Sequence, residues 1–258
     1  EESMKLRDKA YYKIRATAQG LNDADSFMLK SFAGVDQESA WNFRETHLGD
    51  SAVLRSVAGL DSERAWKIRD RFKGGEVFGN LTSLIGLDSD RAWAFRDDTL
   101  QKHPDNNPLQ TNALMSIAGL DSERAWKLRG SINFNDTTQL LSTLVLSLTG
   151  LDSERAWKLR ELFEFNPALS SLGSHHNNKI SKSLAKSYAG LNSAKAWEFR
   201  SRLEEGVQNT ALFYSLAGLN SQRSWDLRLR LLKEKKKKNI SILIGNDFAE
   251  SLNGNFVT

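Results

Sequence analysis

A chain of 258 residues, 40% hydrophobic and 26% charged, is long enough to bury a substantial core, and neither fraction is that of a disordered protein. The absence of cysteine excludes disulfide bonds, thiolate zinc sites and thiol catalysis. The net charge of +4 comes from residues 233–238, five lysines and one glutamate, so the other 31 basic and 31 acidic residues cancel and the body of the chain is neutral.

The predicted elements are the helices of a repeat, and its position is marked by all seven tryptophans. Each tryptophan stands seven residues after a glycine and three before an arginine, and a serine precedes each glycine by three. In chain order the repeats are centred on Trp41, Trp66, Trp93, Trp126, Trp157, Trp197 and Trp225. Weaker copies flank them, one centred on Phe27 and one at the C-terminal end.

Each repeat is expected to form two helices joined by a tight turn, as the copy around Gly119 illustrates. Leu114 and Ile117 give the preceding segment a helical apolar pattern, and glycine ends that helix in a left-handed conformation. The Asp or Asn two residues after the glycine is expected to be the N-cap of the second helix, which would then begin at Ser122 or its equivalents. These predicted caps are Asp61, Asp88, Asp121, Asp152, Asn192 and Asn220.

Successive tryptophans are 25 to 40 residues apart, within the range of solenoid repeats. We therefore expect an all-α fold in which about eight two-helix hairpins of 25–40 residues stack as a superhelical α-solenoid over residues 1–232. Residues 233–258 would hold a lysine-rich connection and a degenerate C-terminal repeat. The unequal spacing falls in the connections between hairpins, and the longest, residues 166–181, is expected to contain an extra helical turn.

The recurrent tryptophan and arginine are expected to have structural roles. On a helical wheel the arginine falls about 60° from the tryptophan, toward the apolar arc, so it lies on the packed side of the second helix. A buried guanidinium needs hydrogen-bond acceptors, and the free carbonyls that end the first helix of the same or the adjacent repeat are the nearest. These arginines are Arg44, Arg69, Arg96, Arg129, Arg160, Arg200 and Arg228. An arginine ladder for phosphates or carboxylates is the alternative.

A basic row on the outer face of the second helix supplies the candidate ligand-binding residues. It stands two residues before or one residue after the tryptophan, and its members are Arg64, Arg91, Arg124, Arg155, Lys195, Arg223, Lys67, Lys127 and Lys158. Glu63, Glu123 and Glu154 stand four residues before the lysines, the order that favours ion pairs within a helix. We therefore expect much of the row to be neutralised in place.

Catalytic and metal-binding patterns are lacking. His47, His103, His175 and His176 fall in or near connections, and the sequence holds no phosphate-binding glycine loop or zinc-protease motif. Leu140 to Leu148, the longest strongly apolar stretch, is too short to span a bilayer, and no signal-peptide pattern opens the chain. We expect a non-enzymatic protein without cofactor or metal that does not span a membrane; its compartment and oligomeric state stay open.

Ser-Ile-Ala-Gly followed by a short turn and a second helix resembles the hairpins of DNA-reading TAL-effector-type repeats. In that family two turn residues vary to read different bases, whereas the turn here is almost constant, Leu-Asp or Leu-Asn. HEAT-type repeats share Asp at the turn and a basic residue on the second helix, but this sequence lacks their proline-containing turn and their spacing. The positions of the recurrent residues also differ from the tetratricopeptide pattern. The sequence therefore predicts an architecture without a family.

Two classes of function fit this architecture. A scaffold that presents an extended surface to a protein or peptide partner agrees with the neutral body and the lack of reactive residues. The alternative is a nucleic-acid-binding solenoid that contacts phosphates through the basic row and the lysine run 233–238.

Overall fold

The computed structural model describes residues 21–73, 75–132, 137–165, 174–205 and 209–237, which form fourteen helices joined by turns and contain no strand. The predicted all-helical class is therefore confirmed for this part of the chain. The helices group into two compact units, the N-terminal unit ending at Ser116 and the C-terminal unit beginning at Ile117.

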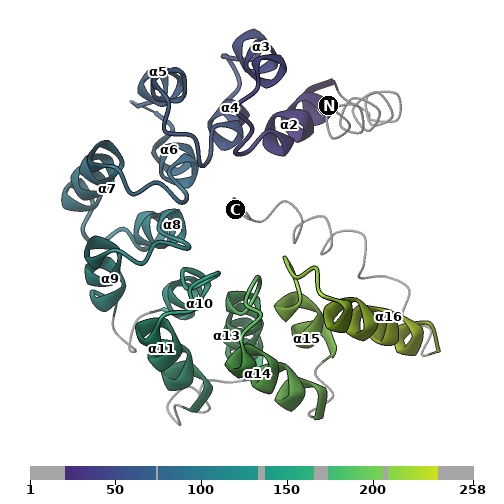
Figure 1. Cartoon of the computed structure of the whole chain (residues 1–258). Coiled ribbons are helices and arrows are strands. Elements are labelled where there is room, and N and C mark those ends of the chain that lie inside the picture. The colour runs from purple at the N-terminus through teal and green to yellow at the C-terminus, as the bar shows by residue number, and fades with distance from the viewer. Residues whose placement is uncertain (1–20, 74, 133–136, 166–173, 206–208, 238–258) are drawn as a thin grey trace. The chain divides into compact units, whose positions relative to one another are not determined.

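The N-terminal unit contains α2 (Leu21–Ser31), α3 (Glu38–Thr46), α4 (Ala52–Ser56), α5 (Glu63–Arg71), α6 (Val77–Ser83), α7 (Asp90–Lys102) and α8 (Asn107–Ser116). The C-terminal unit contains α9 (Glu123–Gly130), α10 (Thr138–Leu146), α11 (Glu154–Phe165), α13 (Ser174–Ser187), α14 (Ala194–Glu205), α15 (Asn209–Ser215) and α16 (Gln222–Lys237). Within each unit a first helix, a glycine turn and a second helix form a hairpin, for example α4 with α5 and α10 with α11 (Figure 1).

The turn of each hairpin depends on a glycine with positive φ. All seven turn glycines have φ between 73° and 79°, a left-handed conformation that costs a residue with a Cβ atom about 1–2 kcal/mol. They are Gly34, Gly59, Gly86, Gly119, Gly150, Gly190 and Gly218. The serine three residues earlier is the last helical residue of most first helices, so two residues separate the helix end from the glycine.

The second helix begins one residue later than the sequence predicts, and the predicted aspartate caps are wrong. Ser62 is the N-cap of α5, and its Oγ accepts a hydrogen bond from the Ala65 amide at 3.4 Å. Ser89 and Ser122 cap α7 and α9 in the same way. The carboxylate of Asp61 is engaged elsewhere, because it accepts the indole N–H of Trp66 at 2.7 Å.

The hydrophobic core is shared between neighbouring hairpins. One cluster joins Leu29 of α2, Trp41 of α3, Leu54 of α4 and Ile68 of α5, all 5% exposed or less. In the N-terminal unit the first helices α2, α4, α6 and α8 pack one against the next, and in the C-terminal unit α13 packs between α10 and α15. A hairpin therefore completes its core with side chains of the hairpin beside it.

The unequal connections are partly helical. α13 begins at Ser174, so residues 174–181 of the predicted long connection are helical, whereas residues 166–173 lie outside the described residues. Phe27 lies in α2, the first helix of the Trp41 hairpin, and is 38% exposed. Residues 1–20, which would hold the first helix of the predicted Phe27 repeat, lie outside the described residues, so that repeat stays a prediction. Residues 233–237 continue α16, and the predicted degenerate repeat that follows lies outside the described part.

Candidate functional site

The recurrent arginine joins each second helix to the first helix of the next hairpin. Arg69 of α5 is 1% exposed, and its Nε donates to Ser83 Oγ of α6 at 2.9 Å. Its Nη2 donates to the carbonyl of Ser83 at 2.8 Å and to that of Val57, at the end of its own first helix, at 2.9 Å. One guanidinium thus bridges the carboxyl ends of two successive first helices.

The same arrangement recurs at five other arginines, each 2% exposed or less. The arginine–serine pairs are Arg44 with Ser56, Arg96 with Ser116, Arg129 with Ser147, Arg160 with Ser187 and Arg200 with Ser215. In all but the last pair the guanidinium also contacts the serine Oγ; Arg200 binds the Ser215 carbonyl through both Nε and Nη2. We call this contact the arginine clamp.

The serine of the clamp works in two directions. The Oγ of Ser83 donates to the carbonyl of Asn80, three residues earlier in the same helix, at 2.7 Å while it accepts from Arg69. A buried hydroxyl therefore has both its donor and an acceptor lone pair satisfied. Small size matters too, because the serines of these clamps are completely buried where neighbouring first helices meet.

The clamp arginines keep their charge at neutral pH. Burial lowers the pKa of Arg69 to about 10, with Asp61 partly opposing the shift. Burial likewise lowers the pKa of the other clamp arginines to about 10, namely Arg44, Arg96, Arg129, Arg160 and Arg200. The guanidinium also lies against the tryptophan of its own helix, with Arg69 Cζ 4.7 Å from the Trp66 ring centroid.

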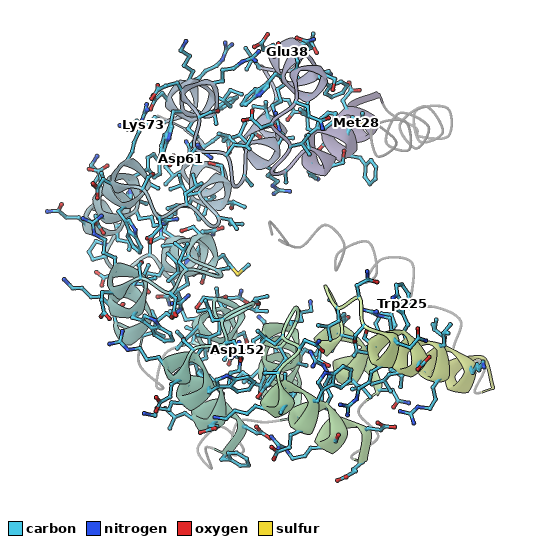
Figure 2. All side chains as sticks on the ribbon, viewed as in Figure 1. Met28, Glu38, Asp61, Lys73, Asp152 and Trp225 are labelled. Carbon is cyan, nitrogen blue, oxygen red and sulfur yellow. The ribbon has the colours of Figure 1, made fainter. Side chains whose placement is uncertain are left out.

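Three turn aspartates connect the tryptophan of their own hairpin to the next hairpin. Asp61, labelled in Figure 2, accepts the Trp66 indole at 2.7 Å and the Oγ of Ser89, the N-cap of the second helix of the next hairpin, at 3.3 Å. Asp121 and Asp152 accept from their own tryptophans and from Ser153 and Ser193 in the same manner. Trp41, Trp66, Trp93, Trp157 and Trp197 are buried, Trp126 is half-buried and Trp225 is 49% exposed.

The basic row that the sequence offers as a ligand surface is engaged in contacts between hairpins. Arg64 lies 4.9 Å from the ring centroid of Trp41 in the preceding hairpin and forms ion pairs with Glu38 and Glu45, both at 2.8 Å. Arg91 lies 4.4 Å from the Trp66 centroid. Arg155, Lys195 and Arg223 cover Trp126, Trp157 and Trp197 at 6.0, 5.6 and 4.1 Å. Arg124 is exposed at the corresponding position of α9.

The predicted pairs within one helix form in one of three cases. Lys158 pairs with Glu154 at 2.7 Å, but Glu63 and Glu123 instead bind Arg91 and Arg155 of the following hairpins, at 3.0 and 2.5 Å. Both arginines stand on the adjacent second helix, so these two ion pairs join neighbouring hairpins. Lys67 and Lys127 are exposed. Within the row, Arg64, Arg91 and Arg155 thus pair with carboxylates of the preceding hairpin, and Lys158 pairs within its own helix.

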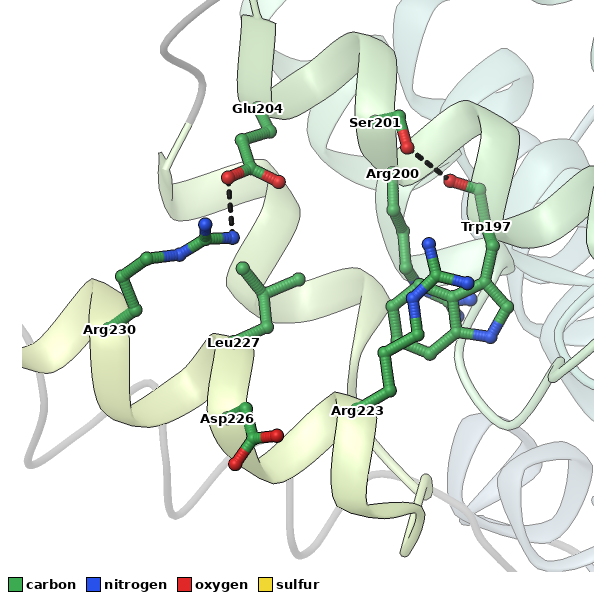
Figure 3. A pocket seen from close by; sticks show the side chains of 8 residues that line it. All are labelled: Trp197, Arg200, Ser201, Glu204, Arg223, Asp226, Leu227 and Arg230. Atoms are coloured by element: carbon green, nitrogen blue, oxygen red, sulfur yellow. Dashed lines mark hydrogen bonds and ion pairs between the residues drawn. The ribbon is translucent and has the colours of Figure 1, made fainter.

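A hollow of about 470 Å³ lies between α14 and α16 (Figure 3). Arg230 and Glu204 form an ion pair at 2.5 Å on one side, Arg223 covers the Trp197 ring on the other, and the Ser201 hydroxyl donates to the Trp197 carbonyl at 3.1 Å. Leu227 and Asp226 complete its lining with Arg200. Of its charged groups, Arg230 and Glu204 pair with each other, whereas Asp226 accepts a hydrogen bond from Gln222 Nε2 at 2.8 Å.

His47 and His103, the histidines whose side chains are described, stand at the ends of different helices. His47 stacks on Phe43 with ring centroids 4.2 Å apart and lies 3.4 Å from Asp25, and His103 ends α7. His175 and His176 lie in α13, and their side chains are outside the described residues. In the described ranges, no three His, Asp or Glu side chains are grouped to hold a metal ion. None of the described helices is both long and apolar enough to cross a membrane.

Comparison of the chain with protein-family models finds no match, and comparisons with curated proteins and with solved structures find none either.

Proposed function

We propose that the chain is a non-catalytic interaction module, an α-solenoid of about eight two-helix hairpins that presents an extended surface to a protein or peptide partner. The observation that carries the proposal is the arginine clamp. Six buried guanidinium groups donate through Nε and Nη2 to serine and backbone oxygens of their own and the next hairpin, so the recurrent arginine serves to join hairpins.

The surfaces that vary from hairpin to hairpin are then the ones available to a partner. The tryptophans and the basic residues over them are fixed by contacts between second helices. The first helices differ in sequence and in length, from five residues in α4 to fourteen in α13. The connections between hairpins differ as well. Repeat proteins combine a constant joint with a variable surface in this way when they bind other chains.

The ion pairs of the basic row count against the alternative of nucleic-acid binding. Phosphate binding requires protein cations that are free to replace the counterions of the nucleic acid, whereas Arg64, Arg91 and Arg155 already contact carboxylates. In the lysine run, residues 233–237 form the end of α16, and residue 238 lies outside the described residues.

A direct binding comparison tests the proposal. A library of displayed peptides is selected on the folded chain, and the enriched peptides are synthesised and titrated; we expect micromolar or tighter binding. In parallel, labelled single- and double-stranded DNA and RNA are titrated at two salt concentrations. Tight oligonucleotide binding with a steep salt dependence, together with no enriched peptide, would establish the nucleic-acid alternative and refute the proposal.

A further inference from the structure

A row of three lysines on α13 forms no ion pair with any acidic residue that the structure describes. Lys179, Lys182 and Lys186 are spaced by three and four residues, so they lie on one side of the helix. Lys179 and Lys182 are exposed and Lys186 is half-exposed. Among the ion pairs of the described C-terminal unit none involves these lysines, in contrast to Arg155, Lys158, Arg202 and Arg230 of the second helices.

The neighbouring first helices align with this row in register. Lys179 Nζ donates to Gln139 Oε1 of α10 on one side, and Lys186 Nζ lies 4.7 Å from the ring centroid of Tyr214 of α15 on the other. Gln139 and Lys179 stand at the same distance before the clamp serines of their helices, eight residues, and Lys186 and Tyr214 both stand one residue before theirs. Equivalent positions therefore meet, and neutral side chains flank the lysines.

The described residues of the first helices around the row include no acidic side chain, whereas Asp136, which precedes α10 in the sequence, lies outside the described residues. Segments 137–151, 174–193 and 209–221 include α10, α13, α15 and the turns that follow them. None of the three segments contains Asp or Glu. The acidic residues of this unit's ion pairs lie on the second helices α9, α11 and α14. Among the described residues charge is thus segregated: the first helices α10, α13 and α15 together carry basic but no acidic side chains.

We propose that the surface of α10, α13 and α15 around Lys179, Lys182 and Lys186 binds an acidic segment of a partner protein. The proposal rests on the interaction module proposed above and names its partner. Lys179 and Lys186 are seven positions apart, which corresponds to about 10.5 Å along the helix axis. Carboxylates on two turns of a helix, or on about four extended residues, match this span.

An acidic protein segment fits this surface better than a nucleic acid. Single-stranded nucleic acids are bound by exposed aromatic rings together with cations, but Tyr214 is 6% exposed and its ring is already covered by Lys186. The row also lacks arginine, whose forked guanidinium is suited to phosphates. Half-buried Leu146 and Phe213, on the flanking helices, add apolar contact area that a peptide side chain uses.

The test uses the full chain and a short fluorescein-labelled peptide of alternating glutamate and alanine, with the same peptide in glutamine as its neutral counterpart. We expect the glutamate peptide to bind at low salt and the glutamine peptide not to bind. Lys179→Glu with Lys182→Glu should weaken binding at least about tenfold, which corresponds to about 1.4 kcal/mol. The matched control, Lys30→Glu with Lys73→Glu, changes the net charge equally on exposed lysines of the N-terminal unit and should leave affinity within about twofold.

Four outcomes overturn the proposal. Equal weakening by both charge-reversed chains would show a general charge effect, and a single-stranded oligonucleotide that binds where the glutamate peptide does not would identify a nucleic acid as the occupant. If selected library peptides bind but the glutamate peptide does not, this inference fails while the proposed interaction module stands; if neither binds, both fail. Lys179→Gln with Lys182→Gln, and circular dichroism of every variant, separate loss of the site from loss of the fold.

Discussion

At the scale of single residues, the buried guanidinium is the group with the most partners. Arg129 donates to Ser147 Oγ and to the carbonyls of Ser147, Ile117 and Leu120, and it is 2% exposed. Arg228, at the equivalent position of α16, is half-buried and bonds to the carbonyl of Leu216 within its own hairpin and to the Oγ of Ser224 in its own helix. The two arginines therefore separate the effect of the clamp from the effect of the residue type.

We expect Arg129→Met to lower the free energy of unfolding by about 3 kcal/mol or more, because it leaves buried carbonyls without donors. Arg228→Met should cost less than about 1 kcal/mol. Among the described residues, Arg228 makes no hydrogen bond to a following hairpin that the substitution could break. Urea denaturation followed by circular dichroism measures both. Equal losses in the two variants would show that the clamp contributes little beyond ordinary packing.

A buried amide gives a prediction of opposite sign. Asn80 of α6 is 1% exposed, and neither its Oδ1 nor its Nδ2 has a hydrogen-bond partner. Other first helices carry Val53 and Leu144 at this position, three residues before the clamp serine. Because an unpaired buried polar group costs about 1–3 kcal/mol, we expect Asn80→Leu to raise the unfolding free energy by about 1–2 kcal/mol.

The control for this substitution is Asn112→Leu. The side chain of Asn112 accepts from Thr82 at 3.2 Å and donates to the Pro108 carbonyl at 2.8 Å, so its removal should be neutral or destabilising. The midpoint of thermal unfolding distinguishes the two variants. A lower midpoint for Asn80→Leu would mean that its larger side chain overfills the space between α6 and its neighbours.

At the scale of the helix and its turn, the glycine conformation can be isolated from packing. A Cβ atom on Gly150 or on Gly130 would meet no atom within 4 Å, but Gly150 has φ +79° whereas Gly130 is the last residue of α9. We expect Gly150→Ala to destabilise the chain by about 1–2 kcal/mol and Gly130→Ala to stabilise it by up to about 1 kcal/mol. The measurement is the urea midpoint, and the same sign for both substitutions would contradict this account of the turn.

At the scale of several hairpins, a shared core links the first two hairpins of the N-terminal unit. Leu54 of α4 is completely buried in the cluster that also holds Leu29, Trp41 and Ile68. We expect Leu54→Ala to cost about 2–5 kcal/mol and to speed hydrogen exchange throughout α2 to α5, because these helices lose a common contact. Exchange in α13 and α15 should be unchanged. Uniform loss of protection along the chain would show that it unfolds as one cooperative body.

The sequence by itself determined the parts of this protein that depend on local conformation and on recurrence. Glycine at a fixed distance from Trp defined the turns, and the helical wheel placed the arginine between Trp and the apolar arc, where the six clamp arginines are 2% exposed or less. The N-cap was misplaced by one residue, since aspartate and serine are equally good caps and only the nearby indole shows which of them is engaged elsewhere.

Only the tertiary structure decided which charges meet. Glu63 binds Arg91 of the next hairpin rather than Lys67 of its own helix, and the partner of each clamp arginine is a serine 12 to 27 residues further on. Connections of unequal length separate such residues in sequence, whereas stacking of the hairpins brings them together. For the same reason the lysines of α13 carried no signal in the sequence: their lack of carboxylate partners among the described residues is a property of α10 and α15 beside them, and it is set by packing.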